Sequence, residues 1–313
     1  MSIIREAIAE PSEDGERFDK VLADTFPEFS RAKIRRTIEW GGAYLDGLRV
    51  KIASRPVHAG QQLTLCLLER DEDYVLKDIP VRIVHQDEAL LIVDKPYGLP
   101  SQGTREDDRN HLLRAVTDHV TRSLGLRAGS KVRLLHRLDW GTSGLLAFAL
   151  TPAAYNLFLK PPSPRKLYLA VCSGQPPIWS GTIDAPIGAH PRMPGRHAVL
   201  PRGGKPSRTL YRVLRHIPGV SLIAAAPLTG RTHQIRLHLL HIGCPVLGDD
   251  FYGGLMALPS AGNAIPVPRM MLHAARLSFI HPLTKRRFAA LSPAPSEMID
   301  ILDRAAGAGQ RRS

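Results

Sequence analysis

Six short segments with high β-propensity constrain the fold of this chain more than any other feature of its sequence. Their apolar runs have the length of strands and are too brief for most helices. The segments are Ile79 to Val84, Ala89 to Val93, Gly144 to Leu150, Tyr168 to Cys172, Thr209 to Leu214 and Leu222 to Ala226. Helical patterns are fewer here, at His111 to Leu124 and at Thr232 to Ile242. Because strands and helices do not alternate regularly, we expect an α+β domain in which helices flank a mixed, largely antiparallel sheet.

Residues 17 to 66 show the pattern of a small unit with its own core. Apolar residues recur at helical spacing from Phe18 to Leu22, and Ser30 is a suitable N-cap for a second short helix. A hairpin follows with Asp46-Gly47 as its turn, and Leu63 to Leu68 has the composition of a closing strand. We therefore expect a small N-terminal α/β module.

The second helix of this module is basic. It carries Arg31, Lys33, Arg35 and Arg36. A helix with one basic face is a common way to present cations to the phosphates of RNA. The same pattern also fits an amphipathic helix whose charged face is simply solvated, so both interpretations stay open.

An acidic, polar segment from Glu69 to Asp78 is interpreted as a linker. We predict three parts of the chain, namely the module with its linker over 1–75, a second domain over 76–305, and a disordered basic tail over 306–313. Residues 186 to 208 are rich in proline, glycine and arginine, which predicts a long loop that is functional or flexible.

The charge balance favours a polyanionic partner. The formal net charge of +13 suits either nucleic acid or an anionic membrane surface. The longest apolar runs are far too short to span a bilayer, and residues 1–17 lack the apolar stretch of a signal peptide. Cys66, Cys172 and Cys244 are widely spaced and indicate no disulfide framework. We expect a cytoplasmic monomer with no membrane partner.

Two stretches resemble nucleotide-binding or hydrolase motifs but lack a required residue. The stretch Gly203 to Ser207 resembles the end of a phosphate-binding loop, yet Pro206 follows the lysine where Ser or Thr is needed. The stretch Gly141 to Gly144 resembles a nucleophile elbow but is one residue too short. Neither chemistry is supported.

A possible zinc site is the weakest of the candidates. His238, His241 and Cys244 could meet on a helix, and zinc would be the preferred metal. No acidic ligand stands nearby, and His233 does not share the spacing. Core or RNA-facing histidines are the favoured interpretation, and we expect neither a metal nor a cofactor.

The most informative stretch runs from Leu135 to Gly144. It places His136, Arg137 and Asp139 between apolar strands, just before a tight turn. An aspartate at the edge of a sheet is costly to desolvate unless it is paired. Such an aspartate can act as a nucleophile or a base, or it can simply cap the turn and pair with Arg137.

This stretch resembles the signature of RluA-type pseudouridine synthases, which reads His-Arg-Leu-Asp and then Thr-Ser-Gly. Four further stretches resemble motifs of that family and stand in the family's order. They are Lys95 to Gly98, Lys166 to Ala170, Gly230 to His238 followed by Gly248-Asp249 and Tyr252-Gly253, and Leu272 to Ala274 with Leu277, Phe279, His281 and Pro282. Residues 17 to 66 also resemble the S-four-type RNA-binding module often found at the N-terminus of the family. Five motifs in order are specific where one alone would be weak.

The resemblance implies roles for individual residues. Asp139 matches the catalytic aspartate, and Arg236 matches the basic residue that pairs with it. Tyr168 matches the tyrosine that stacks on the target base and takes part in proton transfer. Arg137 matches the arginine that fills the gap left by the flipped nucleotide, and we group His136 with it as an RNA-contacting residue. The implied reaction breaks the glycosidic bond of a flipped uridine, turns the uracil and rejoins it through carbon, without cofactor or metal.

Two other functions are weighed against this one. A non-catalytic RNA-binding or ribosome-assembly protein would need the basic module but not Asp139, Tyr168 and Arg236 together. A carboxylate-based glycosidase or nucleosidase usually uses two carboxylates, whereas the motif supplies one. We expect isomerisation of uridine in structured RNA, and the module favours ribosomal over transfer RNA as the target. The chain departs from many relatives at Leu99-Pro100, where they carry a Val-His pair, and this difference bears on the choice of RNA.

Overall fold

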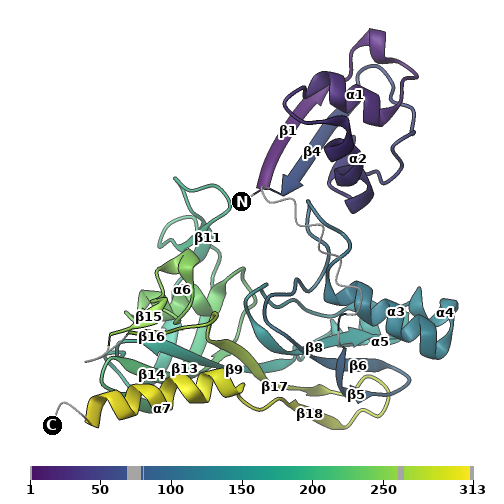
Figure 1. Cartoon of the computed structure of the whole chain (residues 1–313). Coiled ribbons are helices and arrows are strands. Elements are labelled where there is room, and N and C mark those ends of the chain that lie inside the picture. The colour runs from purple at the N-terminus through teal and green to yellow at the C-terminus, as the bar shows by residue number, and fades with distance from the viewer. Residues whose placement is uncertain (1, 69–78, 80, 260–263, 311–313) are drawn as a thin grey trace. The chain divides into compact units, whose positions relative to one another are not determined.

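The computed structural model describes residues 2–68, 79, 81–259 and 264–310, and its contacts divide the chain into two units. One unit comprises residues 1–80 together with 100–118, and the other comprises 81–99 with 119–313 (Figure 1). The predicted linker, Glu69 to Asp78, lies outside the described residues. The boundaries near residues 75 and 305 stay predictions, and the contacts group the segment 100–118 with the N-terminal unit.

The N-terminal unit packs two helices against a four-stranded antiparallel sheet. In sheet order the strands are β1 (Ser2–Ile8), β4 (Gln62–Leu68), β2 (Ala43–Leu45) and β3 (Leu48–Arg49). The two helices are α1 (Phe18–Thr25) and α2 (Arg31–Trp40). A single 3-10 turn, η1 (Pro11–Glu13), precedes them. Phe18 and Leu22 of α1, Ile34 and Ile38 of α2 and Leu63 of β4 are fully buried and form the core. The predicted α/β module is therefore present, with β1 as a strand that the sequence pattern did not reveal.

Local sequence explains where α2 begins and how the hairpin turns. The Oγ of Ser30 accepts a hydrogen bond from the Lys33 backbone N–H at 3.2 Å, which is the predicted N-cap. Gly41 ends the helix with a φ of 85°, a left-handed conformation that glycine adopts without strain. Asp46 and Gly47 both have positive φ, as the two-residue turn of a tight hairpin requires.

Residues 100–118 complete the N-terminal unit by covering two of its aromatic side chains. The backbone N–H of Asp108 donates to the Trp40 carbonyl at 2.9 Å, and the guanidinium of Arg109 lies 3.8 Å from the centre of the Trp40 ring. The hydroxyl of Tyr44 donates to the Arg105 carbonyl at 2.9 Å. The unit is thus assembled from two separate stretches of the chain.

The second unit is built on one ten-stranded sheet. Its main path, in spatial order, is β10 (Ser180–Asp184), β13 (Arg208–Ile217), β14 (Val220–Pro227), β9 (Arg165–Ser173), β17 (Leu272–Ile280), β8 (Ser143–Ala149), β6 (Leu90–Lys95) and β5 (Arg82–Gln86). β18 (Arg287–Leu291) pairs with β17, and β7 (Arg133–Leu134) pairs with β8. Every pair is antiparallel except the parallel pair β17–β8. The predicted mixed, largely antiparallel α+β fold is confirmed.

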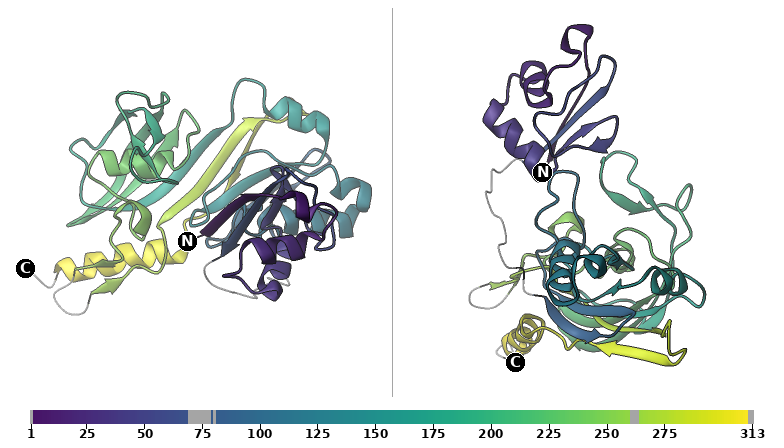
Figure 2. Two further views of the ribbon diagram at one scale, coloured as in Figure 1. Left: turned by 90° about the horizontal axis from the view of Figure 1, so that it is seen from above. Right: turned by 90° about the vertical axis from the view of Figure 1, so that its right-hand side faces the viewer.

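Helices flank this sheet. Helix α3 (Leu112–Leu124) begins in the segment grouped with the N-terminal unit, and the later helices of the second unit are α4 (Leu126–Gly129), α5 (Pro152–Phe158), α6 (Gln234–His241), the 3-10 turn η2 (Asp250–Tyr252) and α7 (Ser296–Gln310). Helices α6 and α7 both contact β13 and β14 and lie on opposite faces of that part of the sheet (Figures 1 and 2). A short ladder, β15 (Ala257–Leu258) with β16 (Ile265–Pro266), lies outside the large sheet. No helix among the described residues has the length and apolar composition needed to cross a bilayer.

Two predicted irregular segments contain regular structure. The segment 186–208 holds a small hairpin, β11 (Ile187–Ala189) and β12 (His197–Val199), which packs against α6. Helix α7 continues to Gln310, so residues 306–310 are helical where a disordered tail was predicted, while 311–313 lie outside the described residues. Four buried residues, Met298, Ile301, Leu302 and Ala305, fall on one face of α7, which explains why the helix forms against the sheet.

Close approach of two central strands explains the Thr-Ser-Gly sequence at the start of β8. Gly144 has a φ of 108°, and a Cβ at this position would clash with the backbone of Ala274 in β17. On the same strand pair, the Oγ of Ser143 is hydrogen-bonded to Nδ1 of His273 at 2.9 Å. The start of β8 is thereby fixed beside β17, and the loop that carries Asp139 immediately precedes it.

Candidate active site

Asp139 lies in the turn between β7 and β8, with its side chain 30% exposed. The Thr142 backbone N–H donates to the Asp139 carbonyl at 3.0 Å, which closes the turn. The carboxylate is not paired with Arg137, as one interpretation of the sequence had it. It accepts a hydrogen bond at Oδ2 from Nη1 of Arg236, at 3.1 Å, from a residue 97 positions later in the chain.

Arg236 bridges two carboxylates. It extends from α6, is 9% exposed, and donates from Nε and Nη2 to the two oxygens of Asp249, each at 2.7 Å. Burial alone would lower the pKa of Arg236, but the hydrogen bonds and charges of Asp249 and Asp139 together raise it. A bidentate pair of this kind fixes the plane of the guanidinium, so one nitrogen is left to face Asp139.

Asp249 is a site residue that sequence reasoning did not single out. Its side chain is 2% exposed and also accepts a hydrogen bond from the Tyr252 backbone N–H at 3.2 Å. Gly248 before it has a φ of 73°, and a Cβ there would clash with the backbone of Arg269. The signal was present in the Gly248-Asp249 motif, but only the fold brings this carboxylate against Arg236.

Tyr168 lies in β9, one strand removed from β8 across β17, and is 7% exposed. Its neighbours across the two adjacent strands are Ala225 and Ala274, which place little bulk beside the ring. Burial, and then the negative charge of Asp139, raise the pKa of Tyr168 far above its usual value. The side chain is therefore a protonated phenol within electrostatic range of the aspartate.

Aromatic side chains pack behind Arg236. The guanidinium carbon lies 4.7 Å from the centre of the Tyr252 ring, and the Tyr252 hydroxyl is hydrogen-bonded to Nδ1 of His233 at 2.7 Å. His233 precedes α6 in a left-handed conformation with a φ of 55°, and burial lowers its pKa. Phe251 and Tyr252 line one side of a cavity of about 630 Å³. Residues of α6 and of the β11–β12 hairpin line its other sides.

Lys95 ties the loop 96–99 to the loop of Asp139. It is fully buried, and its Nζ donates to the carbonyls of Pro96 and Leu99, both at 2.8 Å, and of Trp140 at 3.3 Å. Burial lowers the pKa of Lys95 to about 7, and Asp139 opposes that shift. Three carbonyl acceptors match the three donors of an ammonium group, so the contacts favour the charged form. Sequence reasoning assigned this lysine to a motif but gave it no role.

Arg137 and His136 have different environments. Arg137 is exposed and makes no hydrogen bond or ion pair with any residue that the structure describes, so it is free to meet a ligand. His136 points inward: its Nε2 accepts from the Ala147 backbone N–H at 3.3 Å, its Nδ1 is buried, and burial lowers its pKa well below the usual value. The structure gives no support to the expected RNA contact at His136, because one ring nitrogen accepts a hydrogen bond from the β8 backbone and the other is buried.

The basic helix of the N-terminal unit is anchored by a buried acid. Asp19 is fully buried and pairs with Arg17, Arg31 and Arg35 at 2.6 to 3.0 Å. Burial alone would raise the pKa of Asp19, but the three arginines lower it to about 2. One negative charge among three cations leaves an excess of two positive charges, and Arg31 and Arg35 keep nearly half of their side-chain surface in solvent.

The two remaining basic residues of α2 lie over aromatic rings. The Nζ of Lys33 is 5.7 Å from the centre of the Phe29 ring, and the guanidinium of Arg36 is 5.9 Å from that of Trp40. All four predicted basic residues thus hold defined positions on one helix.

The hydrogen bonds of His238 explain why zinc binding near α6 is disfavoured. Both ring nitrogens of His238 are hydrogen-bonded, Nδ1 to the Thr209 hydroxyl at 2.8 Å and Nε2 to the Ala185 carbonyl at 2.9 Å. His238 is fully buried and so has no free nitrogen for a metal.

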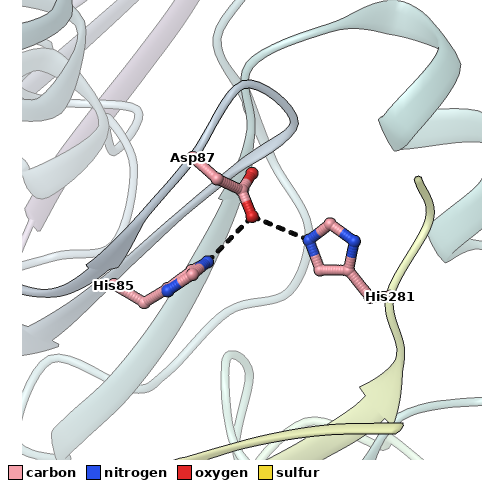
Figure 3. A group of neighbouring side chains, drawn as sticks. All are labelled: His85, Asp87 and His281. Atoms are coloured by element: carbon pink, nitrogen blue, oxygen red, sulfur yellow. Dashed lines mark hydrogen bonds and ion pairs between the residues drawn. The ribbon is translucent and has the colours of Figure 1, made fainter. Parts of the chain in front are cut away.

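A second cluster contains side chains of the kinds that bind metals, but one of its candidate donor nitrogens carries a proton. His85, Asp87 and His281 lie together, and Oδ2 of Asp87 is 2.8 Å from Nε2 of each histidine (Figure 3). The Nδ1 of His281 accepts from the Leu283 and Thr284 backbone N–H groups, so its Nε2 carries the proton and donates to Asp87. The other oxygen of Asp87 accepts from two backbone N–H groups. The cluster is therefore a hydrogen-bonded clamp between the β5–β6 turn and the end of β17.

Known proteins are similar to this chain over both of its units. A family model of RNA pseudouridylate synthases matches residues 89–241, and an S4 domain model matches residues 16–63. The ribosomal large subunit pseudouridine synthase D of Xanthomonas campestris is 34% identical over 95% of this chain and 91% of its own length. That of Nitrosomonas europaea is 36% identical over 92% of this chain and 84% of its own. The solved structure of human RNA pseudouridylate synthase domain containing 1 is 27% identical with a TM-score of 0.54, covering 73% of this chain and 95% of its own.

Proposed function

This chain belongs to the RNA pseudouridylate synthase family, and from that premise we propose that Asp139, Tyr168 and Arg236 isomerise uridine in large-subunit ribosomal RNA. The observation that carries the catalytic assignment is the bridge from Asp249 through Arg236 to Asp139, with Tyr168 in electrostatic range. The alternative of a non-catalytic RNA-binding protein gains no support, because the complete set of reactive side chains is assembled in one unit.

The chemistry of the product defines what the site must do. Conversion of uridine to pseudouridine breaks the N1–C1′ bond and forms a C5–C1′ bond, with no change in composition. The proton on C5 must leave, and N1 must gain one. Asp139 can serve as a nucleophile at C1′ or as a base toward C5, and Arg236 would offset its charge in either role. Tyr168 is protonated, because its pKa is raised. It can therefore donate its proton only if it accepts another proton in the same step.

Access to the uridine requires that it leave its stack. A base within a stem is flipped out at a cost of a few kcal/mol. The exposed guanidinium of Arg137, two residues before Asp139, is suited to fill the space that the nucleotide vacates. The phenol ring of Tyr168 supplies a face on which the flipped uracil can stack.

Affinity for RNA is assigned to the N-terminal unit. Arg31 and Arg35 present two positive charges from a rigid helix, and Lys33 and Arg36 lie on the same helix. We assign phosphate contacts to these residues, because neutralising phosphates is sequence-independent and fits a module separate from the chemistry.

The choice of RNA rests on the relatives. Those named above act, by their names, on the ribosomal large subunit. We infer the same class of RNA for this chain, and hence action in the cytoplasm. We also propose that the protein acts as a monomer and needs no metal.

The decisive experiment maps pseudouridines in total RNA with and without this gene. One or more sites in large-subunit ribosomal RNA should disappear on deletion, return with the wild-type gene and stay absent with Asp139→Asn. In vitro, RNA labelled with tritium at uridine C5 should release label as pseudouridine forms. Loss of a site in transfer RNA would refute the substrate, free uracil would indicate a hydrolase, and strong turnover by folded Asp139→Asn would refute the catalytic assignment.

A further inference from the structure

The residue after the catalytic aspartate is an exposed tryptophan on a fixed backbone. Trp140 has 63% of its surface in solvent. Its carbonyl oxygen accepts hydrogen bonds from the Gly98 backbone N–H at 2.9 Å and from the buried ammonium of Lys95 at 3.3 Å. The next residue, Gly141, lies against the side chain of Met270. The backbone is therefore anchored on both sides of the indole while the ring itself faces water.

An exposed indole in this position is not explained by the fold. Within the described part of the chain, the Trp140 ring makes no ring contact and no hydrogen bond through its N–H. Burying an aromatic side chain is worth several times the thermal energy, so leaving most of an indole in water forgoes that stabilisation. Trp140 directly follows Asp139 in the chain, so the exposed indole belongs to the same loop as the catalytic carboxylate.

A second exposed aromatic residue stands on the loop that is hydrogen-bonded to the Trp140 backbone. Tyr97 is 46% exposed and adjoins Gly98, whose N–H holds the Trp140 carbonyl. From the protein side, the guanidinium of Arg269 lies 5.1 Å from the centre of the Tyr97 ring. Arg269 is itself buried and donates to the Ser143 hydroxyl and the Met270 carbonyl, both at 3.2 Å. The side of the Tyr97 ring that faces the protein thus lies against the buried guanidinium of Arg269, while the rest of the ring is exposed to solvent.

We propose that Trp140, with Tyr97 on the loop hydrogen-bonded to its backbone, is a stacking platform for a base of the substrate RNA next to the target uridine. This inference rests on the proposed function. When a nucleotide flips out toward Asp139, its neighbours lose a stacking partner. Arg137 lies two residues before Asp139 and can fill the vacated position, whereas Trp140 lies immediately after it and offers a π-face to a neighbouring base.

The chemistry of the platform predicts its selectivity. Every base has a π-face, so an indole stacks without strict sequence preference and contributes affinity rather than chemistry. The cations nearby, Arg137 outside and Arg269 beneath Tyr97, favour an anionic polymer over a peptide. The platform should therefore act on binding of the RNA and on its register, leaving the bond-breaking step to Asp139.

Steady-state kinetics provide the first test. Trp140→Ala should raise KM and the dissociation constant for RNA about 5- to 100-fold, which corresponds to the loss of one aromatic stack, with kcat changed less than threefold. Trp140→Phe should recover most of the affinity. The matched control is Trp179→Ala, since Trp179 is 53% exposed but belongs to the β10 edge of the sheet. Equal KM values for wild type, Trp140→Ala and Trp179→Ala would overturn the proposal.

Fluorescence gives a direct readout of stacking. The chain has three tryptophans, so a Trp40→Phe, Trp179→Phe protein reports Trp140 alone. A transcript of large-subunit ribosomal RNA should quench this protein, and a Trp40→Phe, Trp140→Phe protein should correct for absorption by the RNA. Equal quenching of the two proteins, at RNA concentrations where a filter assay shows saturation, would overturn the platform. If tritium release is absent from every variant, including wild type, the proposed function fails, and the fluorescence result still decides whether Trp140 stacks on RNA.

Discussion

Arg236 donates to both carboxylate oxygens of Asp249 at 2.7 Å and reaches Asp139 with its one remaining nitrogen at 3.1 Å. The two carboxylates are not equivalent. Asp249 is enclosed and holds the guanidinium plane, while Asp139 is partly exposed and touches it once. The arginine is thereby oriented before any RNA arrives, which is the arrangement expected of a preorganised electrostatic partner.

Asp249→Asn should lower kcat at least tenfold with a smaller effect on KM, because an amide holds the guanidinium less firmly. Asp249→Ala should also reduce the free energy of unfolding by about 3–5 kcal/mol, since a buried arginine loses its main partner. Tritium release and urea titration measure the two effects. Asp250→Asn is the matched control, as that neighbouring side chain is exposed. An unchanged kcat in a folded Asp249→Asn protein would contradict the positioning role.

Tyr168→Phe keeps the ring and removes the proton, so RNA binding should persist while turnover falls at least tenfold. Tyr168→Leu should lose both, with binding weaker by about 1–3 kcal/mol for one aromatic stack. Filter binding and single-turnover tritium release separate the two quantities. Tyr211→Phe serves as the control, because this buried tyrosine of β13 loses only a hydrogen bond to the Ile178 carbonyl. Near-native turnover in both Tyr168 variants would remove this residue from the site.

Asp87 should make stability depend on pH at the acidic end. Burial alone would raise its pKa, but His85, two backbone N–H groups and His281 lower it to about 2, from an ordinary value of 3.8. Because the folded pKa is the lower one, the stabilisation is fully present above the ordinary value and disappears as the pH falls through about 2. A shift of this size corresponds to about 2 kcal/mol.

Urea titrations at pH 6 and pH 2 check this expectation. The difference in unfolding free energy between wild type and Asp87→Asn should shrink by about 2 kcal/mol between the two pH values. Asp118→Asn should show no such change, because that carboxylate is exposed and its nearest cation lies 3.8 Å away. A difference that stays constant with pH would show that the Asp87 clamp does not titrate in this window.

Arg31→Gln with Arg35→Gln should weaken RNA binding and flatten its salt dependence. Each lost phosphate contact lowers the slope of log K against log salt by roughly 0.7 to 0.9, so the double variant should change it by about 1 to 2. Binding measured from 50 to 300 mM salt gives the slope, and a melting curve checks that Asp19 tolerates its remaining partner, Arg17. Lys20→Gln with Arg55→Gln removes the same charge from the same unit away from α2. Equal slopes for the two double variants would show that α2 is not the contact surface.

The sequence predicted those features that depend on neighbours in the chain. The cap at Ser30, the turn at Asp46-Gly47 and the six predicted strands follow from local propensity and periodicity, and each is present, although the first strand starts at Arg82 and not at Ile79. Strand β1 was missed because apolar and polar residues do not alternate along it, since Ile4 and Ile8 are exposed and the charged pair Arg5-Glu6 occupies both faces.

What the sequence could not supply are partners distant along the chain. Asp139 and Arg236 were paired only through family resemblance, and Asp249 had no assigned role, because spacing does not reveal which side chains converge on one sheet. The same limit explains Asp19, whose position in α1 gives no sign that it neutralises part of the basic helix. The partner of His136 was hidden for a related reason, since only the three-dimensional structure shows that its ring accepts a hydrogen bond from the β8 backbone.

The two-part composition of the N-terminal unit has a consequence for biosynthesis. Residues 1–80 leave the ribosome well before residues 100–118, yet Trp40 and Tyr44 obtain part of their covering contacts from the later segment. During translation the nascent module therefore carries partly uncovered aromatic surface until Arg105, Asp108 and Arg109 have been added. Strands β5 and β6, which belong to the other unit, are translated within that interval. The order of synthesis thus interleaves the two units, and neither can be completed by a contiguous stretch of chain.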